Sequence, residues 1–162
     1  MEGCFVEFDP LDDARAERAI DVMNHVAMLK RNGVLDEASM ALELSDADRA
    51  FFRVLTPEEW HEWNEFWFST PLPQRHSPTM PSPGWDFASM VEAIADAEFD
   101  ITGVRTERDS FYLTFEPQSY PFGGTGCLVA LLECLGNKVL SVNDGTGVVP
   151  YVQPVRWEPR NG

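Results

Sequence analysis

The residue types best suited to chemistry form a glycine cluster, Gly123–Gly126, just before an apolar segment at 127–135. Backbone N–H groups at the start of a helix bind anions, so this turn is a candidate anion or small-molecule site. A phosphate-binding P-loop needs Lys and then Ser or Thr after its last glycine, and Cys127 and Leu128 stand there instead. The plain structural interpretation is a tight turn that lets a buried helix approach a sheet.

A dinucleotide-binding motif fits the same cluster only in part. Gly124 and Gly126 have the G-x-G spacing, and Asp144 lies 20 residues after Gly124, where such motifs carry an acidic residue. However, a Rossmann turn follows its strand directly, and Pro117 and Pro121 separate the preceding strand from the glycines. The sequence predicts no cofactor, and a ligand site with Gly124, Gly126 and Asp144 stays an alternative.

His61 and Glu65 share a helix face at i, i+4 and resemble a fragment of a metal site. A zinc protease motif needs a second histidine where Glu65 stands, and His25 and His76 are isolated in the sequence. We therefore predict no metal site and interpret these residues as the polar face of a helix.

No complete catalytic motif is present: the sequence has no G-x-S-x-G segment and no Cys with an evident His partner. Cys127 starts a helix, which lowers a thiol pKa, but its apolar surroundings raise it, so we expect an inert thiol. Cys4, Cys127 and Cys134 form no CxxC motif and the first ten residues lack signal-peptide features. The sequence thus favours a cytoplasmic protein without enzymatic activity.

Tryptophans form the most distinctive pattern. Trp60, Trp63 and Trp67 fall at i, i+3 and i+7 of one helix, and Trp85 follows a proline-rich stretch. Such a stripe either packs into the core or anchors a partner, because Trp is enriched among residues that dominate binding energy. If exposed, these rings form an apolar anchor inside an acidic rim that includes Glu62.

Helix signals dominate the first part of the chain. Asp9-Pro10 is a start signal for a first helix that ends before Gly33, and Ser45 and Thr56-Pro57 are start signals for later ones. Apolar spacing adds a helix at 35–44. A further helix is expected at 85–98.

The stretch 69–84 contains five prolines and predicts a long loop without helix or strand that wraps around a single domain. After it, alternating residues predict strands at 99–107, 110–116 and 138–142, with an edge strand within 148–157. The apolar segment between them predicts a buried helix that Thr125 caps and Gly136 ends. The expected fold is α+β, with N-terminal helices packed on a small, mainly antiparallel C-terminal sheet.

Charge limits the partners of this 162-residue chain. Twenty-seven acidic and 12 basic residues give a formal net charge of −15, and 16 of the acidic residues precede residue 66. A strongly negative protein is not expected to bind nucleic acid or an anionic membrane, whereas a basic protein or a cation is permitted.

These observations lead to a first hypothesis: a non-catalytic binding protein whose acidic, Trp-bearing surface engages a basic protein. Its small, acidic and Trp-rich character is similar to that of bacterial immunity proteins, although no motif carries the similarity. The alternative is a small-molecule or anion site at Gly123–Gly126, with Tyr120 and Asp144 close by. A third hypothesis is a homodimer formed through the Trp stripe.

Overall fold

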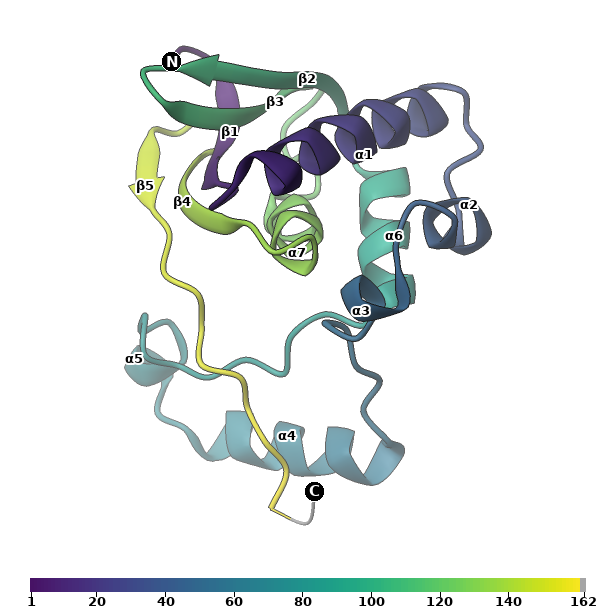
Figure 1. Cartoon of the computed structure of the whole chain (residues 1–162). Coiled ribbons are helices and arrows are strands. Elements are labelled where there is room, and N and C mark those ends of the chain that lie inside the picture. Colours follow the sequence, from purple (N-terminus) through teal and green to yellow (C-terminus); the bar gives the residue numbers. More distant parts are fainter. Residues whose placement is uncertain (161–162) are drawn as a thin grey trace.

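The computed structural model describes residues 1–160 and has the predicted α+β fold. Within this range, five strands form one antiparallel sheet in the order β2-β3-β1-β4-β5 (Figure 1). The strands are β1 (Cys4–Asp9), β2 (Phe99–Glu107), β3 (Ser110–Pro117), β4 (Lys138–Asn143) and β5 (Val148–Pro150).

Strand β1 lies in the middle of the sheet, although the sequence pattern predicts no strand before residue 99. Val6 and Phe8 are fully buried on one face, and Phe5 packs edge-on against Tyr112 on the other. The carboxylate of Glu7 accepts hydrogen bonds from the hydroxyl groups of Tyr112 and of a serine on β4. Both faces of β1 are therefore covered, which removes the simple alternation that marks a half-buried strand.

The first helix starts later than the sequence pattern indicates. Leu11 has φ +73°, a left-handed conformation that a right-handed helix cannot contain. Asp9 Oδ1 accepts the N–H of Leu11 at 2.9 Å, so Asp9 stabilises this turn and does not cap the helix. Asp12 takes that role by accepting the N–H of Arg15 at 2.8 Å.

Two later helices begin at the predicted capping signals. Ser45 with Asp48, and Thr56 with Glu59, form capping boxes at the starts of two helices, as the sequence predicts. None of the described helices is long and apolar enough to cross a membrane. The helices are α1 (Asp13–Arg31), α2 (Glu37–Ala41), α3 (Asp46–Arg49), α4 (Pro57–Ser69), α5 (Leu72–Arg75), α6 (Phe87–Asp96) and α7 (Gly126–Cys134).

Helix α7 is the centre of the core, with seven of its nine residues buried. It packs against β1, β4 and α6, while α1 contacts β2. Gly136 ends it with φ +87°, as predicted. Thr125 does not cap it with its side chain, contrary to the prediction, because its backbone is helical (φ −107°, ψ −8°) and not extended as capping requires.

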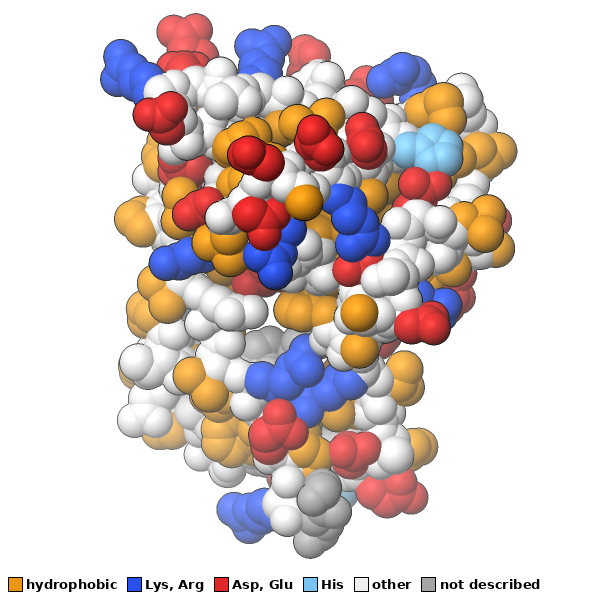
Figure 2. Space-filling model, in the orientation of Figure 1, with side chains coloured by type: hydrophobic (Ala, Val, Ile, Leu, Met, Phe, Trp, Pro, Cys, Tyr) orange, Lys and Arg blue, Asp and Glu red, His pale blue; other side chains and the backbone are white. Residues whose placement is uncertain are grey.

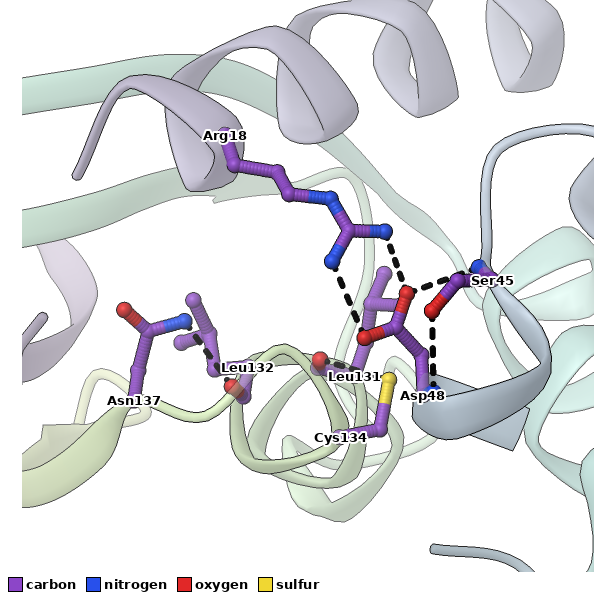
Figure 3. Close-up of polar contacts among 7 residues, drawn as sticks. All are labelled: Arg18, Ser45, Asp48, Leu131, Leu132, Cys134 and Asn137. Atoms are coloured by element: carbon purple, nitrogen blue, oxygen red, sulfur yellow. Dashed lines mark hydrogen bonds and ion pairs between the residues drawn. The ribbon is translucent and has the colours of Figure 1, made fainter. Parts of the chain in front are cut away.

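A partly buried ion pair joins α1 to α3 above α7 (Figure 3). Arg18 donates two hydrogen bonds to the carboxylate of Asp48, which also accepts the backbone N–H of Ser45 at 2.8 Å. Burial alone would raise the pKa of Asp48, but the hydrogen bonds from Arg18 and Ser45 outweigh it and hold that pKa below its usual value.

The proline-rich stretch contains one turn of helix, α5, where the sequence predicts neither helix nor strand. Pro71 precedes this turn and Pro73 lies in its first turn, positions at which the missing N–H does no harm. Near its end the stretch pairs with the C-terminal segment: Ser82 donates to the carbonyl of Val155 at 2.9 Å and accepts the N–H of Trp157 at 2.7 Å. Helix α4 lies beyond this paired layer, away from the sheet (Figure 1).

Candidate functional site

Helix α4 is held at the margin of the molecule, and none of its 13 residues is buried. Trp60 is 43% exposed, and Trp63 is half-buried against Trp157, with ring centroids 5.5 Å apart. Trp67 packs on Trp63 and lies under the guanidinium of Arg75 at 5.5 Å. The stripe is thus neither a core element nor fully free, since one edge is covered by the C-terminal segment.

The acidic residues of α4 line a groove between this helix and the C-terminal segment. His61 pairs with Glu65 at 3.1 Å, and the carboxylate of Glu62 accepts the backbone N–H of Arg160 at 2.7 Å. The groove measures about 640 Å³, and its walls carry four carboxylates within two turns of helix. Its lining residues are Thr56, Glu58, Glu59, His61, Glu62, Glu65, Pro159 and Arg160.

A second hollow, the waist cavity, lies between the sheet-bearing part of the molecule and the paired layer. It has a volume of about 440 Å³. One face of α7 forms its floor, because Gly126, Val129, Ala130 and Glu133 fall at i, i+3, i+4 and i+7. Its remaining walls are Phe51, Ser82, Gly84, Trp85, Thr125, Val142, Tyr151, Gln153, Pro154 and Arg156.

Glu133 supplies the carboxylate of the waist cavity, and the hydroxyl of Tyr151 donates to it at 3.3 Å. Burial raises the pKa of Glu133, and the hydrogen bond from Tyr151 opposes this shift. Burial together with the neighbouring carboxylate also raises the pKa of Tyr151, so its hydroxyl stays protonated and remains a donor. The pair gives the cavity one oriented carboxylate acceptor, in walls that combine apolar side chains with Ser82, Thr125, Gln153 and Arg156.

Arg156 supplies the basic group at the rim of the cavity. Its guanidinium stacks over the ring of Phe51 at 5.6 Å and donates to the carbonyl of Phe51 at 2.7 Å. In Figure 2, basic side chains gather at mid-height, with acidic side chains above and below them. Arg53 lies in the same region by its contacts, because it donates to the carbonyls of Pro83 and Trp157.

The structure brings some of the predicted site residues together. Trp85 lines the waist cavity beside Gly126, and it also lines a neighbouring cleft of about 360 Å³ that contains Trp60. A Cβ atom at Gly126 would lie 3.2 Å from the Trp85 ring, so glycine permits this close contact. Trp63 and Trp67 line neither of these two hollows.

Two other predicted residues lie outside the waist cavity. Gly124 is exposed in the turn before α7. Asp144 lies in the turn between β4 and β5, where both the backbone and the side chain of Thr146 donate to it and lower its pKa. Tyr120 contacts the turn between β4 and β5 at Gly145. A Cβ atom added to Gly145 would lie only 2.5 Å from the Tyr120 hydroxyl.

The two cysteines of α7 are buried thiols. Burial raises the pKa of Cys127 to about 11 and that of Cys134 to about 12, so both remain protonated near neutral pH. Across residues 1–160, no group of three His, Cys, Asp or Glu side chains is placed to hold a metal ion.

Sequence reasoning missed Glu133, Tyr151 and Arg156 as possible ligand contacts. One signal was available for Glu133, because it is the one charged side chain in an otherwise apolar helix. Tyr151 and Arg156 lie in a segment without regular periodicity, and only its path over α7 places them at the cavity.

In comparisons with protein-family models, curated proteins and solved structures, none was found to match this chain. The site must therefore be interpreted from its own geometry and charge.

Proposed function

We propose that this chain is a non-catalytic binding protein, of the inhibitor or immunity kind, that engages a basic protein partner in the cytoplasm through α4. The observation that carries the proposal is the exposure of α4, a helix with three tryptophans and no buried residue. Helices usually owe their place in a fold to burial of an apolar face. An aromatic helix left half-uncovered is therefore well suited to burial against a partner.

Charge supports a basic partner over a second copy of the chain. The groove beside α4 carries Glu58, Glu59, Glu62 and Glu65, so two such grooves brought together would repel each other. A Lys or Arg side chain entering the groove would instead meet several carboxylates at once. The net charge of −15 would also accelerate the encounter with a basic protein.

Trp60 and Phe68 are the exposed aromatic rings of α4 and would serve as its apolar anchors, although neither lines the acidic groove and Trp60 lines the cleft that it shares with Trp85. Trp60 is 43% exposed and Phe68 is 72% exposed, which leaves both rings accessible without any movement of the chain. Aromatic side chains at the centre of an interface contribute much of its binding energy, and charged groups at the rim mainly set its rate and specificity. The acidic groove and these rings supply both components.

The test is affinity capture of a binding protein from the native host, followed by titration with the purified partner. In the first bait, Glu58, Glu59, Glu62 and Glu65 are changed to Gln, which preserves shape and the capping box at Glu59. A matched control bait carries the same change in charge on other faces, at Glu17, Asp21, Glu92 and Glu116, which are all exposed.

We expect the groove variant to bind the partner at least about tenfold more weakly than the matched control, and Trp60→Ala to weaken binding by a similar factor. Raising the salt concentration from about 0.05 M to about 0.5 M should weaken wild-type binding, because it screens exposed charges. Equal affinities for the groove variant and the control would overturn the proposal. Sedimentation showing a stable dimer through α4 would instead favour self-association.

A further inference from the structure

The waist cavity has the size of a small-molecule site. Its volume of about 440 Å³ lies within the range of roughly 300–1,000 Å³ that is usual for ligand pockets. Its floor is a rigid face of α7, the most buried helix of the fold. Its roof is the C-terminal segment, which paired backbone hydrogen bonds fix to Ser82. The hollow is therefore preformed.

Two charged residues, Glu133 and Arg156, line this cavity, and neither of them forms an ion pair within residues 1–160. None of the ion pairs formed within residues 1–160 includes Glu133, and its one hydrogen bond comes from the neutral hydroxyl of Tyr151. Arg156, at the rim, is exposed and already donates to a backbone carbonyl. The desolvated and unpaired charge inside the cavity is thus negative, which favours a cation.

The apolar walls indicate which kind of molecule carries this positive charge. Trp85, Phe51 and Tyr151 place three aromatic side chains around the hollow, and Val129 and Val142 add aliphatic surface. Aromatic rings attract cations through their faces and pack well against flat apolar groups. From these features we propose that the waist cavity binds a small organic cation, an aromatic amine in its protonated form, with its ammonium group on the carboxylate of Glu133.

This site differs from the anion site that the glycine cluster suggests. The cavity touches that cluster only at Thr125 and Gly126, and the opposite end of the same helix face carries Glu133, about 10 Å away along the axis. The proposed cation site is also separate from the α4 groove, since the two hollows share no lining residue. The two proposals can therefore fail independently.

Three indole compounds of similar size test the charge preference: tryptamine, the neutral indole-3-ethanol and the anionic indole-3-propionate. Titration calorimetry with the whole protein near neutral pH measures their affinities. We expect tryptamine to bind at least about tenfold more tightly than indole-3-propionate, with indole-3-ethanol between them.

Glu133→Gln tests whether the carboxylate causes this preference. The amide keeps the shape and can still accept the hydroxyl of Tyr151, so the fold is retained and a melting curve confirms it. We expect tryptamine affinity to fall about tenfold, while the affinity for indole-3-ethanol stays the same. Glu92→Gln, on the exposed side of α6, removes the same charge outside the cavity and should change neither affinity.

Val142→Phe tests the location of the site independently. A larger side chain on the cavity wall should weaken the binding of all three compounds. The proposal is overturned if wild type binds none of the compounds or binds them equally. It is also overturned if Glu133→Gln and Glu92→Gln have the same effect on tryptamine, or if Val142→Phe, still folded, leaves every affinity unchanged.

Discussion

Trp63 of α4 packs edge-on against Trp157, with ring centroids 5.5 Å apart and ring planes inclined by 65°. Trp157 is buried, whereas every residue of α4 is at least partly exposed. The pair connects α4 to the C-terminal segment, and Arg53 strengthens the connection by donating to the carbonyl of Trp157 and to the carboxylate of Glu158. The proposed binding helix thus depends on a segment far away in the sequence.

Trp157→Ala should detach α4 while the sheet stays folded. We expect amide hydrogen exchange in α4 to accelerate with little change in β1 and β4, because no residue of α4 is itself buried and Trp63 packs on the buried ring of Trp157. The free energy of unfolding should fall by about 3 kcal/mol, the lower end for loss of a buried aromatic ring. Trp157→Phe keeps an aromatic edge contact with Trp63, so its free energy of unfolding should fall by less. Unchanged exchange in α4 would show that other contacts hold it.

Asp48→Asn should destabilise the fold by about 2 kcal/mol near neutral pH, because Arg18 loses its charged partner and Ser45 a strong acceptor. Asp46→Asn removes an exposed acid from the same helix and should have a smaller effect. Urea unfolding measures both variants, and equal losses would contradict the role of the pair.

The effect of Asp48 should also depend on pH. Because the folded state holds its pKa below the unfolded value, the folded state binds fewer protons there and the carboxylate stabilises the fold above the unfolded pKa. This contribution is lost as the pH falls through the lowered pKa. The stability curves of wild type and Asp48→Asn should therefore converge in acid, and a constant difference would show that charge is not the cause.

Lys30→Met should loosen the end of α6. The Lys30 ammonium donates to the carbonyls of Ile94, Ala95 and Ala97 at 2.8, 3.3 and 2.6 Å, and these groups would lose their donor. We expect a loss of about 2 kcal/mol in urea unfolding. The control is Lys138→Met, the same substitution at an exposed residue, and it should lose much less stability.

Only one of the three cysteines should react with DTNB in the native protein near pH 8. Cys127 and Cys134 are buried and their pKa values are raised to about 11 and about 12, whereas Cys4 is partly exposed. Cys4→Ser should remove the fast reaction, and denaturant should release the two remaining thiols. A second fast thiol in the native state would show that α7 opens readily.

Local signals were sufficient for much of the fold. The hairpin was predictable because only Arg108 and Asp109 separate two alternating segments, and both residues adopt the positive φ of a two-residue turn. The Thr56 capping box likewise marks the start of α4. Strand β1 was not predictable in this way. Its short segment has apolar residues on both faces, and its place depends on two strands more than 100 residues later.

The site was harder to predict for the same reason. The Trp stripe is visible as helical spacing, but how much of it is exposed depends on where Trp157 and the C-terminal segment lie. The waist cavity combines Phe51, Trp85, Glu133 and Tyr151, which no local pattern connects. Only the tertiary structure brings these four residues together.

The central position of β1 has a consequence for how the chain folds. Residues 4–9 are made well before their partners at 111–115 and 138–143. The sheet therefore cannot form until residues 138–143 are made, and contacts between distant segments slow folding. Until then β1 presents at least one unpaired edge, so the nascent chain is most exposed to aggregation and to chaperones before residues 138–143 emerge.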